Sequence, residues 1–255
     1  MARGTARLRV PLPQFLVNLT SSASSLPIPS DTPPMYLPPQ FAAKDRTFAL
    51  ELMRTHPFAS LISTDDEGTP FVSHIPLHLE DRTAVGALAQ SDWVLLGHVA
   101  KANPHWRYLE SRPRALVTFL GAHAFMSTRV YPDLVRVPTW SYLAVHCTVQ
   151  ASLINDPLDK DRLLKKLIAD HDPDYADQWR GLGAEYAHKM LAGIVGFELR
   201  VSDVQCKIKL NQHRPESHAR MHEIYATGSE DERELAQWME RLGLSGAQAN
   251  KGDAA

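Results

Sequence analysis

The feature of this sequence that most constrains the fold is a strict alternation of side chains over Pro70–Leu79. Successive side chains of a strand point to opposite faces of the sheet, so the alternation predicts a strand with one face in a core. The residues assigned to the barrel interior are Phe71, Ser73, Ile75, Leu77 and Leu79, and those assigned to the opposite face are Val72, His74, Pro76 and His78. Phe58–Thr64 is also strand-like, and the Asp65–Gly68 cluster between the two segments is a turn signal, so together they predict a β-hairpin.

Strand signals recur along the chain and outnumber helix signals. Further strands are predicted at Thr83–Gln90, Trp93–His98, Arg114–Leu120, His123–Ser127, Tyr142–Leu153 and Gly193–Lys209. Helices are predicted between Asp45 and Pro57, from Pro104 to about Glu110, between Asp156 and Asp172, around Met221, and after the capping box of Ser229 and Glu232. Many strands with few, scattered helices favour a mainly β fold with α additions, in which the sheet forms a barrel, over an alternating βαβ sheet.

Composition and charge exclude several classes of partner. The chain has 255 residues, of which 44% are hydrophobic and 22% charged, so it can bury a core as one domain with additions. Its formal net charge of -2 provides no overall positive field, and direct nucleic-acid binding is not predicted. No uninterrupted apolar run approaches the ~20 residues that cross a bilayer, so no membrane contact is predicted. Cys147 and Cys206 have neither metal-ligand nor disulfide spacing, which favours a reducing, cytoplasmic location.

The first 34 residues differ from the rest of the chain. They are rich in proline and serine, contain Arg3, Arg7 and Arg9, and have no acidic residue before Asp31. A segment of this composition cannot bury enough apolar surface to offset the entropy lost on ordering. Residues 1–34 are therefore predicted to be an N-terminal extension that is disordered or lies upstream of the true start, which would be Met35.

The stretch Gly97–Trp106 predicts an anion site. A strand end runs through a short turn into a helix that Asn103 would cap and Pro104 would open, which leaves backbone N–H groups at a positive dipole end. Lys101 adds a charge and His98 a donor, so these elements together could hold a phosphate monoester. The alternative is that Lys101 is a solvated surface charge.

The remaining candidate residues are histidines and aromatics. His74 and His78 are four apart on one strand, roughly 13 Å, which is too far to bind one metal ion, and His218 and His222 lack an evident third ligand. No metal site is therefore predicted. Trp140 and Tyr142 share a strand face, where they could stack on a planar ligand or pack in a dimer interface. The chain contains no nucleophile elbow, Walker loop or dinucleotide-binding fingerprint.

Several motifs in order resemble the PaiB family of FMN-binding proteins, which is described as a family of negative transcriptional regulators. The matching segments are Met35–Pro38 with Phe41, Phe58–Leu61, His74–Leu77, Gly97–Trp106, Gly121–Ser127, Val137–Tyr142, Gly193–Phe197 and Lys209–Arg214. The resemblance implies a split β-barrel of the pyridoxamine-phosphate-oxidase type over residues 35–214, followed by a helical tail over 215–255. It also implies a homodimer with two FMN sites at the subunit interface.

With the resemblance, the predicted FMN-binding residues are His74, Pro76, His98, Lys101, Asn103, Trp140, Tyr142, Lys209 and Gln212. Family members usually carry Asn in place of Ser141, Ser in place of Asn211 and Asn in place of His213, which bears on individual flavin contacts. The resemblance implies a regulatory FMN-binding protein that acts on transcription indirectly or as a metabolite sensor. Two alternatives remain open: an FMN-dependent oxidoreductase acting on a small molecule, and a haem-binding split barrel that uses His123 or His146.

Overall fold

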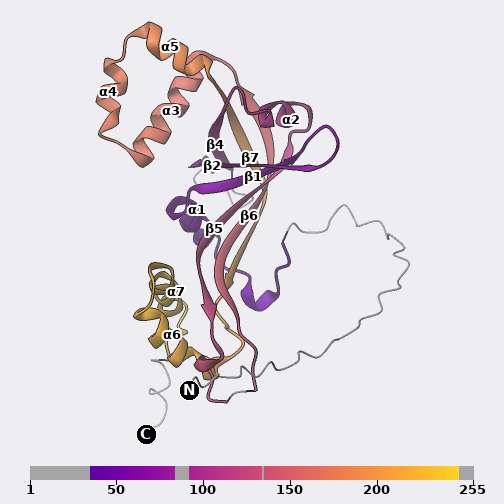
Figure 1. Cartoon of the computed structure of the whole chain (residues 1–255), viewed down its shortest axis with the longest axis vertical. Coiled ribbons are helices and arrows are strands. Elements are labelled where there is room, and N and C mark those ends of the chain that lie inside the picture. Colours follow the sequence, from indigo (N-terminus) through magenta and orange to yellow (C-terminus); the bar gives the residue numbers. More distant parts are fainter. Residues whose placement is uncertain (1–34, 84–91, 134, 247–255) are drawn as a thin grey trace, which may run out of the picture. The chain divides into compact units, whose positions relative to one another are not determined.

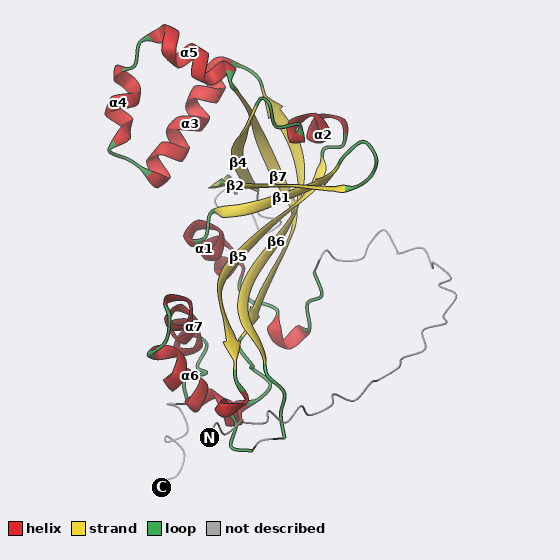
Figure 2. Ribbon diagram, viewed as in Figure 1, coloured by secondary structure: helices red, strands yellow, loops and turns green. Residues whose placement is uncertain are grey.

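The computed structural model describes residues 35–83, 92–133 and 135–246, and these form one seven-stranded antiparallel sheet with helices around it (Figures 1 and 2). The strand order is β2-β1-β5-β6-β7-β4-β3. The strands are β1 (Phe58–Thr64), β2 (Pro70–Pro76), β3 (His78–Asp81), β4 (Trp93–Ala100), β5 (Arg114–Met126), β6 (Thr139–Ile154) and β7 (Ile194–Lys209). The strands predicted before the helix of residues 157–171 are therefore present, apart from Thr83–Gln90. Residues 84–90 of that predicted strand lie outside the described residues, and so does the extension 1–34.

The predicted alternation over residues 70–79 is confirmed, but the segment forms two strands instead of one. Ser73, Ile75, Leu77 and Leu79 are buried, whereas Val72 and His74 are exposed. The break falls at Leu77, whose backbone N–H donates to the Pro57 carbonyl (3.0 Å) rather than to a neighbouring strand of a ladder. After this residue the chain leaves β1 and pairs with β4, so β2 and β3 lie at the two edges of the sheet.

The two strands predicted over residues 114–127 are one strand, β5. Leu120 pairs with Ala144 and His123 pairs with Tyr142, so β5 has one residue more than β6 in this interval. This is a β-bulge, in which one strand takes up an extra residue and bends. Gly121 lies in the bulge, where an added Cβ would be 3.2 Å from Leu143 Cβ, and the interval predicted between two strands, from Leu120 to His123, is this bulge.

Local capping explains where the predicted helices begin. The helices are α1 (Arg46–Thr55), α2 (His105–Ser111), α3 (Pro157–His171), α4 (Tyr175–Gly181), α5 (Ala184–Ala192), α6 (His218–Ala226) and α7 (Glu230–Arg241), with short 3₁₀ turns η1 (Pro39–Phe41), η2 (Thr128–Val130) and η3 (Pro215–Ser217). Asp45 accepts from Thr47 N (2.8 Å) and Asp156 from Leu158 N (2.9 Å). The capping box of Ser229 and Glu232 is complete, with both reciprocal hydrogen bonds present. None of the described helices is long and apolar enough to span a membrane.

Two helices, α4 and α5, were not predicted, and they pack with α3 beside β4 (Figure 1). At the opposite end of β5 and β6, the C-terminal helices are tied to the rest of the domain by polar contacts. Tyr225 of α6 donates to Ser141 Oγ of β6 (3.1 Å), and Arg241 of α7 forms a two-bond ion pair with Glu51 of α1 (2.6 and 2.7 Å). Bidentate pairing of this kind fixes orientation as well as position.

The main core lies between the inner face of the sheet and the helices α1, α6 and α7. Among its fully buried side chains are Leu61, Val117, Leu143, Val145, Phe197, Leu52 and Tyr225. A second, smaller cluster joins Val94 and Leu96 of β4 to Leu163 and Leu167 of α3, on the other face of the sheet. The outer face is therefore covered at β4, and the outer faces of β1, β2, β5 and much of β6 remain open.

A buried histidine, His105, is the first residue of α2. His105 is 0% exposed, its Nδ1 lies 2.9 Å from Ser73 Oγ, and its Nε2 has no hydrogen-bond partner among the described residues. The rings of Phe71 and His105 meet edge to face with centroids 5.1 Å apart. Burial in this apolar setting disfavours the charged imidazolium and lowers the pKa of His105 from 6.5 to about 4.

We therefore expect the fold to lose stability as pH falls from about 6.5 towards 4. A histidine whose folded pKa is depressed stabilises the folded state fully above its unfolded pKa, and this contribution declines as protons bind preferentially to the unfolded chain. Between pH 7.5 and 5 the loss from His105 should be about 2 kcal/mol. Urea unfolding at both pH values should show a smaller pH dependence for His105→Gln, and the same dependence as wild type for the exposed control His188→Gln. An unchanged pH dependence in His105→Gln would contradict the assignment.

Candidate functional site

The outer face of the sheet carries a continuous row of polar side chains across five strands. Strand register places His74, Ser60, Thr118, His146 and Gln205 side by side, from β2 through β1, β5 and β6 to β7. His74 Nδ1 lies 2.9 Å from Ser60 Oγ. His74 and Pro76, which the sequence places on this face, are thus confirmed to face away from the core.

Large apolar side chains surround this row on the same face. The exposed members are Phe58, Val72, Leu120, Phe125 and Trp140. Trp140 is in edge-to-face contact with Phe125 (centroids 6.2 Å apart) and lies near the His123 ring (5.7 Å). Several exposed apolar side chains on one face of a folded domain often mark a binding or assembly surface.

A cationic site lies where β4 ends. Lys101 follows β4 in an exposed turn, and its backbone N–H donates to the Gly193 carbonyl (2.8 Å). Lys160 of α3 donates to the carbonyls of Leu191 (3.4 Å) and Ile194 (3.0 Å), and burial together with the nearby charge of Lys101 lowers its pKa. Among the described residues, neither lysine has a carboxylate within ion-pair distance. Two uncompensated ammonium groups at one end of a strand can attract an anion.

His98 is a further polar residue in the last part of β4. It is half-buried, and burial lowers its pKa, so the neutral imidazole is favoured. Its Nδ1 is buried and has no hydrogen-bond partner among the described residues. Buried polar atoms are nearly always paired, so an unpaired Nδ1 in the last part of β4 suits a contact with a bound ligand.

Asn103 does not take the position expected from the sequence. Helix α2 begins at His105 with Pro104 as its N-cap, one residue later than predicted, and it has only seven residues. The Asn103 side chain accepts from His105 N (3.0 Å) and donates to Ser73 Oγ (3.0 Å). Asn103 thus ties the turn to β2, and the start of α2 has one of its N–H groups already satisfied.

The predicted residues of β6 and β7 form a different cluster at the other end of these strands. Tyr142 pairs with Lys209 in register, and the ammonium groups of Lys207 and Lys209 lie 5.2 and 5.6 Å from the centre of the Tyr142 ring. Lys209 Nζ donates to Thr139 Oγ1 (2.7 Å). Burial and the neighbouring charge of Lys207 lower the pKa of Lys209.

Gln212 shapes the chain reversal after β7. Its side chain accepts from Leu210 N (2.9 Å) and donates to the Ile208 carbonyl (2.5 Å). The adjacent Asn211 has a positive φ of 61°, which Asn tolerates better than most residues, and its amide donates to Tyr131 OH (2.9 Å) and Ser217 Oγ (2.7 Å). Asn211, which departs from the family pattern, therefore supports the turn.

The predicted residues thus separate into two groups that one flavin cannot join within a single chain. His98 of β4 lies beside Gly196 of β7, whereas Lys209 lies 13 residues further along β7. At about 3.3 Å per residue the path along the strand is roughly 40 Å, longer than one FMN molecule. The Asn103–Ser73 hydrogen bond places the turn after β4 against the core-facing side of β2, whereas His74 and Pro76 lie on the opposite face of that strand.

Two residues of these clusters were missed in the sequence. Lys207 lies two positions before Lys209, so the period of a strand places both on one face, and this signal was available. Lys160 belongs to a helix about sixty residues after Lys101, and no local pattern connects them. Packing of α3 and the β7 start brings them together.

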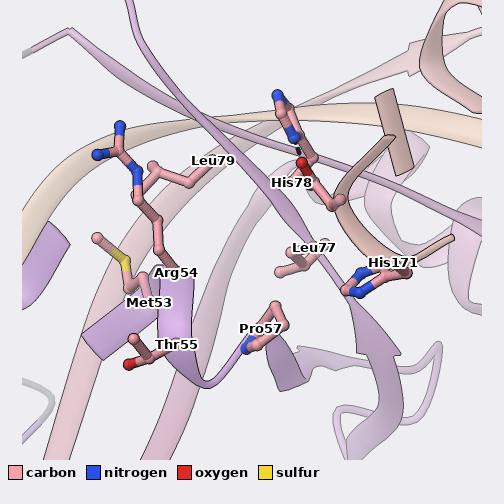
Figure 3. A pocket seen from close by; sticks show the side chains of 9 residues that line it. Met53, Arg54, Thr55, Pro57, Leu77, His78, Leu79 and His171 are labelled. Atoms are coloured by element: carbon pink, nitrogen blue, oxygen red, sulfur yellow. Dashed lines mark hydrogen bonds and ion pairs between the residues drawn. The ribbon is translucent and has the colours of Figure 1, made fainter. Parts of the chain in front are cut away.

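A separate cavity of about 560 Å³ lies between α1, β3 and the end of α3 (Figure 3). His78 Nδ1 is 2.5 Å from Asp170 Oδ2, and this bond orients the ring at the edge of the cavity. Arg54, Thr55 and His171 supply the other polar groups, with Met53, Pro57, Leu77 and Leu79 as apolar lining. No sequence motif pointed to this cavity, because its residues come from three distant segments.

Comparison with known proteins places the chain in a family. Residues 35–203 match the family described as "Putative FMN-binding domain". The "Protease synthase and sporulation protein PAI 2" of Bacillus subtilis (strain 168) is 31% identical over 188 residues, which cover 72% of this chain and 84% of the relative. The flavocytochrome Anf3 from Azotobacter vinelandii has the same fold, with a TM-score of 0.52 and 17% identity over 67% of this chain and 70% of that one. The predicted fold class, a mainly β split barrel of the pyridoxamine-phosphate-oxidase type with α additions, is confirmed. The chain belongs to the PaiB family of FMN-binding proteins, as its motifs predicted.

Proposed function

We propose that this protein is a cytoplasmic homodimer that binds FMN and regulates transcription indirectly, through a partner or by sensing a metabolite. The proposal extends to this chain what the name of PAI 2 says of that protein, a role in protease synthesis and sporulation. The observation that carries it is the cationic end of β4, where Lys101, Lys160 and the unpaired Nδ1 of His98 suit a phosphate.

The residues at this end fit FMN. Lys101 and Lys160 would hold the phosphate, and His98 would offer a polar atom that otherwise lacks a partner. His74 and Pro76, on the outer face of β2, would lie along the flavin. When bound, FMN supplies reversible acceptance of one or two electrons. Lys101 and His74 are exposed, so a flavin held by them would be accessible to small molecules.

The proposed dimer rests on the exposed apolar side chains of the outer sheet face. The side chains of Phe58, Leu120 and Trp140 are 66%, 56% and 52% exposed. All three lie on the outer face of the sheet. A twofold dimer would cover this surface with the same surface of a second copy. The apolar face also lies alongside the polar row of His74 and Ser60, so the interface would adjoin the flavin.

The proposed location rests on the two cysteines, and the proposed indirect regulation rests on the net charge. Cys147 and Cys206 are buried and unbridged, and burial raises the pKa of Cys206 to about 12, so both are unreactive thiols suited to a reducing compartment. With a net charge of -2 the chain lacks the positive field that drives DNA binding, so regulation would be indirect.

An FMN-dependent oxidoreductase is the second candidate, favoured by the exposure of the proposed flavin residues. The absorption spectrum of the purified protein separates flavin, haem and ligand-free forms. Adding NADH or NADPH to the flavin form then tests for enzymatic reduction. Bleaching of the flavin absorbance with turnover would favour the oxidoreductase, and an unreactive flavin would favour the regulator.

Replacing Lys101 should weaken binding of FMN but not of riboflavin. One ammonium–phosphate contact in a partly dehydrated site contributes about 1.5–3 kcal/mol, so Lys101→Ala should weaken FMN binding by roughly 10- to 100-fold. Riboflavin lacks the phosphate and should bind wild type and variant alike. Fluorescence titration measures both, with Lys189→Ala as an exposed-lysine control. Equal loss of both ligands, or no loss of FMN affinity, would refute the phosphate assignment.

A charge on the outer face should separate the dimer. Light scattering at micromolar concentration should give twice the chain mass of 28.5 kDa for wild type. Leu120→Lys should shift the mass to that of one chain, because the variant would bury an unpaired charge of each chain in the apolar interface. Leu158→Lys, at a position 68% exposed on α3, should leave the dimer intact. A wild-type protein with the mass of one chain would count decisively against the proposed assembly.

A further inference from the structure

A second cavity, of about 660 Å³, lies between the start of α1, the end of β7 and the segment that follows α7. Its volume is in the range of small-molecule sites in proteins, roughly 300–1,000 Å³. Much of its lining is apolar, from Ala43, Phe48, Ile208, Leu242 and Leu244. The cavity is therefore suited to a molecule with an apolar body.

The apolar lining continues the main core to the surface. Ile208 is a core residue, 3% exposed, whereas Ala43, Phe48, Leu242 and Leu244 pack against the core and stay only partly buried. Apolar side chains that remain in contact with water around one hollow favour a ligand that covers them, because burying apolar surface is favourable. The hydrophobic effect would thus drive binding here.

The lining favours an aliphatic ligand over a planar aromatic one. The Phe48 ring is in edge-to-face contact with Trp238, with centroids 5.3 Å apart, and the Arg241 guanidinium lies 5.5 Å from its centre. The His213 ring, also in the lining, is in edge-to-face contact with Phe41 (5.5 Å). Both rings therefore have protein partners already, and the other apolar side chains of the lining are aliphatic.

Lys44 supplies a positive charge to the lining of this cavity. It is exposed, and within the part of the chain that the structure describes it forms no ion pair, whereas Lys165 and Lys166 each form one. Asp45 also lines the cavity, but its carboxylate caps α1 by accepting from Thr47 N (2.8 Å). The Lys44 ammonium is thus available to an anionic head group.

The cavity lies on the helix-covered side of the sheet. Ile208 directs its side chain into the core, whereas Leu120 and Trp140 of the proposed dimer surface lie on the outer face. In a twofold dimer built on the outer faces, each cavity is on the side of the sheet away from the interface. Gln212 is in the cavity wall, and its amide is already bonded to Leu210 N and the Ile208 carbonyl.

We propose that this cavity binds an aliphatic carboxylic acid of medium chain length, roughly six to ten carbons, at a site separate from that of FMN. Its chain would lie against Phe48, Leu242 and Leu244, and its carboxylate would contact Lys44. The ligand would connect the segment after α7 to α1, so its binding would stabilise the folded protein.

The test uses octanoate and hexanoate as probes and octanol as the uncharged control. Each is titrated by calorimetry into the full-length protein, with and without FMN. Octanoate should bind in both states, roughly 10-fold more tightly than hexanoate, because two further methylenes are buried. Absence of octanoate binding would overturn the proposal, whether or not the protein binds FMN. Equal affinity for hexanoate and octanoate would also overturn it.

Replacing Lys44 tests the carboxylate contact. Lys44→Met should weaken octanoate binding by roughly 10-fold and leave octanol affinity within about twofold of wild type. Lys189→Met, at an exposed lysine of α5, should change neither. Unchanged octanoate affinity in Lys44→Met, or an equal loss of octanol affinity, would refute the assignment of an acid.

Replacing Leu244 tests the apolar wall. Leu244→Gln should weaken octanoate and octanol alike by roughly 10-fold, because an amide replaces part of that wall. Leu158→Gln, at a position 68% exposed on α3, should leave both affinities unchanged. If Leu244→Gln bound octanoate as wild type does, the cavity would not be the site.

FMN affinity and thermal melting complete the test. Lys44→Met and Leu244→Gln should each keep FMN affinity within about twofold of wild type. A loss of FMN affinity equal to that of octanoate would show that the cavity belongs to the flavin site. Octanoate should raise the Tm of wild type and of Leu158→Gln more than that of Lys44→Met, whose exposed position makes loss of folding an inadequate explanation.

Discussion

The structure depends on β6, because this strand is hydrogen-bonded on both sides along almost its whole length. It pairs with β5 from Thr139 to Gln150 and with β7 from Tyr142 to Ile154. Since side chains alternate, this register directs Leu143 and Val145 into the core and sends the intervening side chains outward. A slip of one residue would bury the outward set, so the same register that builds the core also builds the candidate site.

Most strands and helix starts could be predicted because their signals are local. Alternation located β1 and β2, and the caps at Asp45, Asp156 and Ser229 are each completed by a residue two or three positions away. Features that depend on distant partners were missed. The bulge in β5 exists only relative to β6, and α4 and α5 are short, largely exposed helices separated by the Gly181–Gly183 break, whose support comes from α3.

The candidate site was predictable only in part, for the same reason. Lys101 stood out because it lies in a recognisable strand–turn–helix segment, whereas Lys160 comes beside it through the packing of a helix. Asn103 shows how much a local motif leaves out. Its side chain accepts from His105 N at the start of α2, as a cap would, but its amide also donates to Ser73 Oγ of β2. The second contact depends on a residue thirty positions away, so the local motif could not predict it.

The two lysine pairs, Lys101 with Lys160 and Lys207 with Lys209, share one property: among the described residues, no carboxylate lies within ion-pair distance of their ammonium groups. The chain has 29 acidic residues against 27 basic ones, so counter-charges are not scarce, and on α3 the acid Asp161 pairs with Lys165 one turn away. The ammonium groups of Lys160, Lys207 and Lys209 instead donate to carbonyl or hydroxyl oxygens, and those of Lys207 and Lys209 lie over the Tyr142 ring. Repulsion within each pair lowers stability in the absence of a ligand. An anion bound only by the folded state would offset that repulsion, and its binding would therefore raise the stability of the fold.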